Sequence, residues 1–176
     1  MMITLRMARP ADAPAIARLH VQVWRSAYQG LATQAAYAAL DEPRRLVQWQ
    51  EKLQQPGAAQ VLLAESAGQL AGFCLADAPS HPQFGEHAEI KSLFVSDEHQ
   101  RQGIGRRLLG AAAREMQKLG YRSIALGVVD GNDNAIRFYQ ALGGAPAGNY
   151  TDPGPLWRSS NVIYVWPDIR HLAALK

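Results

Sequence analysis

The segment from Gln100 to Arg106 has the residue types that a binding site for phosphate groups requires. Its sequence, QRQGIGR, follows an apolar run and opens a long helical pattern. The first amides of a helix have no partners within the helix, and they carry the positive end of its dipole. Gly103 and Gly105 have no Cβ atom, so a pyrophosphate could approach their backbone closely. Arg101 and Arg106 would add positive charge beside it.

Two other phosphate-binding motifs are excluded by the residues present. The chain has no Gly-Lys-Ser or Gly-Lys-Thr sequence, so the segment is not the P-loop of an NTPase. It also lacks the third glycine of a dinucleotide fingerprint and the acidic residue that would confirm one. A tight turn between a strand and a helix, with no ligand, stays open as an alternative at this point.

The apolar periodicity predicts the elements that position this segment. Strands are predicted at residues 3–6, 60–65, 69–76, 89–95, 123–129 and 161–166. Helices are predicted at residues 12–23 with Asp12 as N-cap, 31–53 with an interruption near Pro43, 103–119 before a Gly120 C-cap, and 132–142. Residues 78–86 and 148–155 are predicted as loops, the second one mobile. This order predicts a mixed α/β (α+β) fold, with helices on both faces of the sheet and a parallel pair of strands in its middle.

Composition limits the class of protein. The 176 residues fit a single domain over residues 1–176, and 48% hydrophobic with 19% charged residues is ordinary for a globular chain. The one cysteine, Cys74, excludes an internal disulfide, and we expect it to be a buried apolar residue. No secretion signal or long apolar span is apparent, so we expect a soluble, cytoplasmic protein with no membrane partner. The net charge of +3 is too small to favour nucleic acid as a partner.

Three segments together resemble the motifs of the GNAT superfamily of N-acetyltransferases. Gln100–Gly105 is similar to its Gln/Arg-x-x-Gly-x-Gly/Ala motif, and Glu89–Val95 resembles its central strand. Asn132–Gly143 is similar to its Asn-x-x-Ala-x-x-Phe-Tyr-x-x-x-Gly motif. The segments follow the family's order. The resemblance implies a GNAT-type twisted mixed sheet of about six to seven strands and an N-acetyltransferase of the small-molecule type that uses acetyl-CoA and releases coenzyme A.

The resemblance also implies which residues bind the cofactor. The pantetheine arm is expected along the backbone of Leu93, Phe94 and Val95, with an amide near Val95 stabilising the developing oxyanion. Asn132 matches a cofactor-contacting position, and Asn134 is either a second contact or the helix N-cap. The pyrophosphate is expected on the amides of Gln100, Arg101, Gln102, Gly103, Ile104, Gly105 and Arg106.

Two residues are implied in proton transfer. Tyr139 matches the family's general acid, and a phenol with a pKa of about 10 stays protonated at neutral pH and can donate to a leaving thiolate. Glu89 is the best candidate for a general base that removes the proton of an ammonium acceptor, either directly or through a water. A tyrosine packed in the core and a strand glutamate without such a role remain the alternatives. Phe138 is expected to be core alone. No histidine spacing suggests a metal site.

The acceptor is expected to be an amine of a small molecule or a peptide. The segment Trp24–Gly30 resembles one that borders the substrate groove in small-molecule GNAT members, so Trp24 and Tyr28 are predicted to contact the acceptor. The 148–155 loop is expected to lie over that groove. A sensor that binds acyl-CoA without catalysis is the competing hypothesis. The family's frequent pairing makes a homodimer a further expectation.

Overall fold

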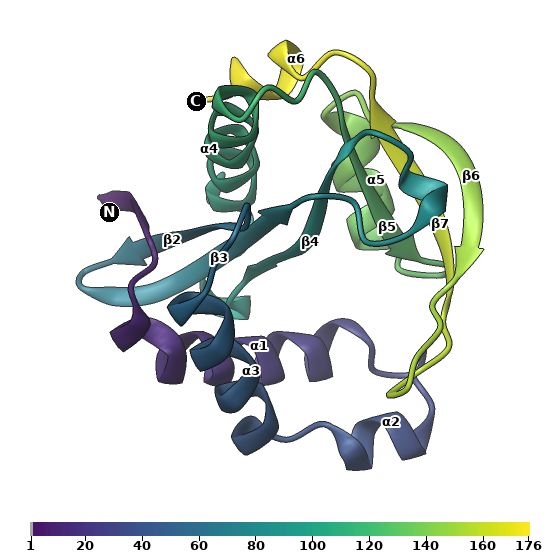
Figure 1. Ribbon diagram of the computed structural model, residues 1–176. Coiled ribbons are helices and arrows are strands. Elements are labelled where there is room, and N and C mark those ends of the chain that lie inside the picture. Colours follow the sequence, from purple (N-terminus) through teal and green to yellow (C-terminus); the bar gives the residue numbers. More distant parts are fainter. Residues whose placement is uncertain (1) are drawn as a thin grey trace.

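The computed structural model describes residues 2–176, which form a seven-stranded mixed sheet flanked by helices (Figure 1). The strands are β1 (Ile3–Met7), β2 (Gln60–Ser66), β3 (Gln69–Asp77), β4 (Ala88–Val95), β5 (Ile124–Val129), β6 (Ala145–Thr151) and β7 (Ser160–Trp166). The α-helices are α1 (Ala13–Ala27), α2 (Gln34–Ala39), α3 (Glu42–Gln54), α4 (Ile104–Lys118), α5 (Asp133–Ala141) and α6 (Arg170–Ala173). The strand order is β1-β2-β3-β4-β5-β7-β6, and of these neighbours only β4 and β5 are parallel.

Helices cover both faces of this sheet, as the apolar periodicity predicts. On one face α4 buries Leu108 and Met116 completely against the strands. On the other face α1 and α3 bury Ile16 and Trp49 against Phe73 of β3. Figure 1 shows α4 on one side of β3 and β4, with α1 and α3 on the opposite side. The mixed α/β fold class and the central parallel pair are therefore confirmed.

The parallel strands β4 and β5 pair only at their first residues. Ladder pairs join Ala88 with Ile124 and Glu89 with Ala125, and no pair follows along the remainder of the two strands. On its other side β4 stays paired with β3, with a bulge that leaves Lys91 without a partner residue on β3. The sheet is therefore split between β4 and β5, over the stretch that the sequence motifs mark.

Helix α4 follows its predicted stripe except at the end. The helix stops at Lys118, and Gly120 follows with a left-handed φ of 94° that allows the chain to turn away. Leu119 is the last residue of the helix predicted over residues 103–119, but it lies outside α4 and 50% of its surface is exposed. It lies one residue past the last helical turn, where the periodicity of 3.6 no longer decides which side faces the core.

The predicted helix over residues 31–53 is two helices. Helix α2 begins after Thr33, whose side-chain oxygen accepts a hydrogen bond from the amide of Ala36. Asp41 caps α3 in the same way through the amide of Arg44, at 2.7 Å. Pro43 lies in the first turn of α3, where the missing N–H costs nothing, so it starts this helix instead of interrupting a longer one.

The C-terminal part contains two elements that the periodicity missed. Residues 148–151, expected in a mobile loop, belong to the edge strand β6, which pairs with β7 from Ala145 to Thr151. This strand contains Pro146 and Gly148 and is exposed along almost its whole length, so it has no apolar alternation to detect. The short helix α6 packs on α4 through the buried Leu172 and was also not predicted.

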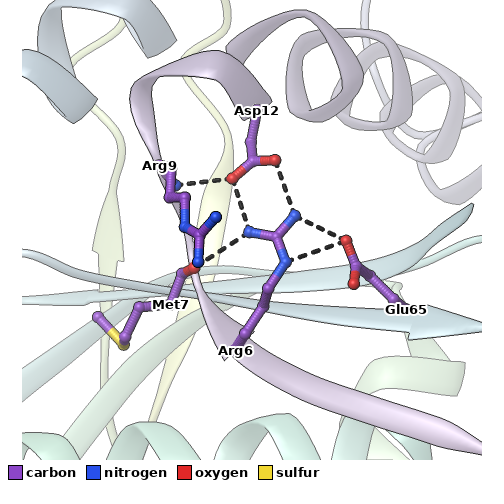
Figure 2. Close-up of polar contacts among 5 residues, drawn as sticks. All are labelled: Arg6, Met7, Arg9, Asp12 and Glu65. Atoms are coloured by element: carbon purple, nitrogen blue, oxygen red, sulfur yellow. Dashed lines mark hydrogen bonds and ion pairs between the residues drawn. The ribbon is translucent and has the colours of Figure 1, made fainter. Parts of the chain in front are cut away.

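Asp12 lies at the N-cap position of α1, but its side chain binds elsewhere. Its two carboxylate oxygens accept from the Arg6 guanidinium at 2.8 Å each, and one also accepts from the amide of Arg9 (Figure 2). Arg6 in turn contacts Glu65 of β2 at 2.6 Å. The network therefore joins β1, β2 and the start of α1. The hydrogen bonds from Arg6, more than its charge, hold the pKa of Asp12 below its ordinary value.

We expect Asp12→Asn to lower the melting temperature by about 2–4 °C, which corresponds to about 1 kcal/mol for a half-buried bidentate pair. Because the folded-state pKa of Asp12 is depressed, its contribution is present above the unfolded pKa of about 3.9 and is lost as the pH falls through the folded value. The difference in melting temperature between the two proteins should thus be constant from about pH 6 to pH 8 and shrink below about pH 4.

Asp168→Asn is the control for this measurement. It breaks an ion pair with Arg170 that lies at the surface, 2.7 Å between Nη2 and Oδ2, and no measurable change is expected. Equal melting temperatures for the parent and Asp12→Asn at neutral pH would show that the Arg6 network does not stabilise the fold.

Candidate functional site

Two cavities meet where β4 and β5 separate. One, of about 690 Å³, is lined by β4, β5, α5 and the turn that leads into α4, and we call it the α4 cavity. The other, of about 730 Å³, is lined by α1, α2, α3 and the segment between β6 and β7, and we call it the α3 cavity. The residues that line both are Tyr28, Lys91, Ser92, Phe94 and Gly127. These five define the junction between the cavities.

The structure brings the predicted cofactor residues together around the α4 cavity, with one exception. Gln102 does not line it, because its side-chain amide turns back and donates to the carbonyl of Glu98 at 3.2 Å. The others all line the cavity: Leu93, Phe94, Val95, Gln100, Arg101, Gly103, Ile104, Gly105, Arg106, Asn132 and Asn134.

Six consecutive backbone amides at this turn are open for a ligand. Within residues 2–176, no group accepts a hydrogen bond from the amides of residues 101–106. The first amide after them that has a partner is that of Arg107, which donates to the carbonyl of Gly103 at 3.1 Å. A row of unpaired amides at the positive end of a 15-residue helix fits an anion with several oxygen atoms, such as a diphosphate.

The two glycines of the turn have different physical roles. Gly103 has a left-handed φ of 78°, and a Cβ atom added to it would meet nothing within 4 Å. Arg101 is also left-handed, with φ at 60°, so the turn that exposes the amides is tightly curved. Gly105, by contrast, is packed against Phe138, since an added Cβ would lie 3.2 Å from the ring. The expected close approach of a ligand therefore concerns Gly103, while Gly105 makes room for α5.

The open edge of β4 offers further backbone groups. The amide of Ser96, which follows β4, donates to the carbonyl of Ala71 in β3 at 2.9 Å. Successive amides of a strand point to opposite sides, so those of Leu93 and Val95 point away from β3, toward the split. The Gln100 side chain, 3.4 Å from the carbonyl of Val95, is on that side. An extended ligand could therefore form strand-like hydrogen bonds with Leu93 and Val95.

Tyr139 of α5 is buried, and its ring lines the α4 cavity. Its hydroxyl has no hydrogen-bond partner among the described residues. Every fully buried side-chain oxygen of those residues does have a partner, so this hydroxyl is not fully buried and is reachable from the cavity. Burial, followed by the neighbouring Cys74 and Tyr28, raises the pKa of Tyr139 above its ordinary value. The phenol is therefore a permanent donor. Cys74 itself is buried as expected, which raises the pKa of its thiol to about 12.

The two asparagines at the start of α5 form different contacts from those expected. Asn132, not Asn134, is the N-cap of this helix, and its side-chain oxygen accepts from the amide of Ala135 at 3.4 Å. Asn134 lies within the first turn and accepts from Arg137 at 2.7 Å. Phe138, expected to be core alone, is only partly buried and also lines the α4 cavity.

Glu89 is buried between β3 and β5 and lines neither cavity. One of its carboxylate oxygens accepts from both the amide and the hydroxyl of Ser80, at 2.7 and 2.6 Å. Its negative charge is close enough to Tyr150 of β6 to help raise the pKa of that phenol to about 12, after burial and Asp152. A Cβ atom on Gly127 would lie 2.5 Å from the Tyr150 hydroxyl, so this tyrosine connects Glu89 with the junction.

The two residues predicted to contact the acceptor, Trp24 and Tyr28, are both at the cavities. Trp24 lines the α3 cavity and Tyr28 lines both cavities. The two rings are in edge contact, with centroids 5.1 Å apart, and Trp157 from the segment between β6 and β7 contacts both. Asp152 and residues 154–157 of that segment border the α3 cavity, while the first half of the predicted loop is a strand.

Sequence reasoning missed His20 and Arg45, which line the α3 cavity from the interiors of α1 and α3. Tyr150 and Asp152, which also line it, fall within the 148–155 segment that was expected to cover the groove. None of the four belongs to a motif. The available signals were a histidine within an apolar helix stripe and an arginine pair at residues 44–45, and both are ordinary features of surface helices.

The structure gives two findings on other site types. Within residues 2–176, no group of three or more His, Cys, Asp or Glu side chains is arranged to hold a metal ion. In the same range, no helix combines the length and the apolar character that crossing a membrane requires.

Known proteins with the same features were found by sequence and by structure. The chain is similar over 177 aligned residues to the uncharacterized N-acetyltransferase YuaI of Bacillus subtilis, at 28% identity, which covers 99% of this chain and 98% of that protein. The fold matches the PaiA N-acetyltransferase of Thermoplasma acidophilum in complex with coenzyme A, with a TM-score of 0.71, 20% identity, and coverage of 94% and 98%. It also matches yncA, a putative acetyltransferase of Salmonella typhimurium with acetyl-CoA, with a TM-score of 0.70, 23% identity and 94% coverage of both chains.

The family model for the acetyltransferase (GNAT) family matches residues 19–144. That range contains β4, the turn of open amides, α4, the split beside β5, and Tyr139 on α5. The match therefore covers most residues of the α4 cavity and the N-terminal part of the α3 cavity, whose remaining wall comes from residues 150–161. The chain belongs to the acetyltransferase (GNAT) family, whose members are N-acetyltransferases that use acetyl-CoA.

Proposed function

We propose that this chain, as one domain, transfers the acetyl group of acetyl-CoA to the amino group of a small molecule or a peptide. The observation that carries the proposal is the meeting of two cavities with different chemistry at the split between β4 and β5. One has open amides for a phosphorylated donor, and the other has aromatic walls. The shared junction is where a donor and an acceptor could react directly.

The α4 cavity fits the donor. The amides of residues 101–106, with Arg101 and Arg106 beside them, would hold the diphosphate. The amides of Leu93 and Val95 would hold the pantetheine arm along β4. Acetyl-CoA, when bound, supplies the acetyl thioester. The two relatives with known complexes hold coenzyme A and acetyl-CoA, which supports this choice of donor.

The reaction forms a bond between the acceptor nitrogen and the acetyl carbon, breaks the carbon–sulfur bond, and moves one proton from nitrogen to sulfur. In this proposal the Tyr139 hydroxyl donates a hydrogen bond to the sulfur as negative charge develops there. A backbone amide of β4 near Val95 that does not bind the pantetheine arm stabilises charge on the carbonyl oxygen. Trp24 and Tyr28 hold the acceptor at the junction. No acyl-enzyme step is required, because the acceptor attacks directly.

Glu89 is proposed to accept the proton of the acceptor through Tyr150 or a water, since its carboxylate does not line the cavity. We expect Glu89→Gln to lower kcat/KM at pH 7 by roughly 10²-fold. The deficit should shrink as the pH approaches the pKa of the acceptor, about 8 for an α-amino group and about 10 for an alkylamine, because the amine then loses its proton without help. A purely structural role for Glu89 would give a deficit that does not depend on pH.

Glu86→Gln is the matched control, because Glu86 is exposed three residues earlier. It removes the same charge without touching the sheet, and its rate should equal that of the parent protein. Full activity of Glu89→Gln at pH 7 would remove this residue from the mechanism.

The test of the function is acetyl-CoA turnover with a panel of amines. Free thiol is measured with polyamines, amino acids, aminoglycosides and short peptides, and mass spectrometry identifies the acetylated product. Thiol release that depends on one amine class would support the transferase and identify the class of its acceptor. Saturable binding of acetyl-CoA with no product from any amine would contradict the proposal and favour an acyl-CoA-binding sensor.

A further inference from the structure

The α3 cavity contains one guanidinium that no carboxylate neutralises. Three cationic side chains line this cavity, and two of them are paired: Arg44 with Asp41 at 3.5 Å, and Lys91 with Asp77 at 3.2 Å. Arg45 has no ion pair with any described residue, and its one hydrogen bond goes to the neutral Gln48 at 3.0 Å. It is also partly buried, and desolvation lowers its pKa. A desolvated cation without a counter-charge is a costly arrangement that a bound anion would relieve.

His20 offers a second donor to the same cavity. The indole nitrogen of Trp49 donates to Nδ1 of His20 at 3.1 Å, and because an indole can only donate, Nδ1 must be unprotonated. The proton of the neutral ring is therefore on Nε2. Nε2 has no hydrogen-bond partner among the described residues. Every fully buried polar side-chain atom of those residues does have a partner, so Nε2 is not fully buried and is accessible from the cavity.

The two groups are neighbours, and together they carry a single positive charge. Burial, and after it the charge of Arg45, lowers the pKa of His20 to about 3, so the imidazole is neutral at physiological pH. One fixed cation with a neutral N–H beside it matches a group with one negative charge and two acceptor oxygens. A carboxylate has both properties, whereas a phosphate would leave negative charge uncompensated.

A negative charge, opposite to that of Arg45, lies near the junction. Asp152 lines the α3 cavity and accepts from the amide of Gly154, and no described Lys or Arg forms an ion pair with it. Its charge acts on Tyr150, whose hydroxyl borders the junction residue Gly127. An acceptor with both charges would thus be drawn with its ammonium group toward the junction and its carboxylate toward α3.

We propose that the acceptor of this enzyme is an amino acid-like molecule, and that Arg45 and the Nε2–H of His20 bind its carboxylate in the α3 cavity. The proposal rests on the proposed function for the amine end. It adds the class of acceptor and the residues that select it. It distinguishes amino acids from polyamines and from peptides attacked at their N-termini, since neither of these has a free carboxylate beside the amine.

The first experiment compares acceptors that differ only in charge. The probes are the twenty L-amino acids, β-alanine and γ-aminobutyrate, each beside its primary amide, in which a neutral carboxamide replaces the carboxylate. The free acids should have a KM at least about 10-fold below that of the amides. In Arg45→Gln the KM for the acids should rise roughly 10- to 100-fold with kcat nearly unchanged, while the KM for the amides should change by less than about twofold. Arg45→Lys should recover part of the loss.

Arg18→Gln is the matched control. Arg18 is an exposed arginine on α1 that is 3.6 Å from Glu42 and lines neither cavity, so its removal changes the net charge equally without touching the site. Its kinetics should equal those of the parent protein for acids and for amides. An equal rise in KM for Arg18→Gln would show that net charge, and not a carboxylate site, attracts the acids.

The second experiment measures binding without acetyl-CoA. N-acetyl-L-amino acids should raise the melting temperature of the parent protein more than N-acetyl-L-amino acid amides do, and Arg45→Gln should abolish the difference. Carboxylate-dependent stabilisation without turnover would support the carboxylate site and overturn the transferase. Turnover of amines with no preference for carboxylates in either assay would support the transferase and overturn the carboxylate site. Neither signal with any probe would overturn both.

Discussion

Tyr139→Phe is expected to lower kcat by roughly 10- to 10⁴-fold and to leave the KM for acetyl-CoA nearly unchanged. The hydroxyl is the one part of this side chain without a partner among the described residues, and it opens into the α4 cavity. A donor that acts on charge developing during the reaction contributes to the rate and not to ground-state binding. The measurement is steady-state thiol release at saturating acceptor.

A folding defect should not account for the loss of activity in Tyr139→Phe. The Tyr139 ring packs edge-on against Phe138 and Trp166, with centroids 5.2 and 6.0 Å away, and a phenylalanine keeps both contacts. Loss of an unpaired hydroxyl leaves no other polar group unsatisfied, so the melting temperature should stay within a few degrees. Tyr121→Phe, which removes a hydroxyl from a residue outside both cavities, is the control. Equal turnover in the parent and Tyr139→Phe would exclude a role in proton donation.

The pKa of the Tyr139 phenol bears on whether it transfers its proton completely to the sulfur or only donates a hydrogen bond to it. The pKa of Tyr139 is raised above the ordinary value of about 10, so it remains protonated throughout the range in which the protein can be assayed. Loss of activity on its deprotonation should therefore not be seen below about pH 10. General acids work best with a pKa near the working pH, so the raised value favours hydrogen bonding to the sulfur over complete proton transfer.

The turn of open amides before α4 was predictable from sequence because its groups are local. The open amides, the two left-handed residues Arg101 and Gly103 and the start of α4 all lie within six residues, and helix geometry alone decides where those amides point. The strong amphipathic period of α4 then positions the turn against the sheet. Even here the backbone amide of Gln100, expected among the open ones, is not open, since it donates to the carbonyl of Asp97 at 3.4 Å.

The set of charged and polar groups in the α3 cavity was not predictable because no local rule joins them. His20, Arg45 and Asp152 come from three elements far apart in sequence and meet only once α1 and α3 pack on one face of the sheet and β6 extends it. The lack of a carboxylate partner for Arg45 is a property of the folded chain. In the sequence, Arg45 is indistinguishable from the neighbouring Arg44, which has Asp41 as its partner.

Gly103→Asp is expected to raise the KM for acetyl-CoA roughly 30- to 700-fold relative to Gly103→Asn. Two like charges about 4 Å apart at an effective dielectric constant of about 20 repel by about 4 kcal/mol, and half of that value already corresponds to about 30-fold. The position tolerates both residues, because a Cβ atom there meets nothing within 4 Å and Asn and Asp are the side chains that best accept a left-handed φ. The two variants therefore share any backbone strain and differ in charge alone.

The melting temperature of Gly103→Asp should not fall together with its affinity for the donor. A carboxylate at the N-terminus of α4 interacts favourably with the helix dipole, so Gly103→Asp should melt no lower than Gly103→Asn although it binds the donor far more weakly. Its deficit in binding should also diminish as salt is raised from about 0.05 to 0.5 M, because mobile ions screen the repulsion. Thermal-shift titration with coenzyme A measures both quantities in one experiment. Equal affinity of the two variants would mean that the diphosphate does not bind at the amides of residues 101–106, and the donor site would have to be sought elsewhere along β4.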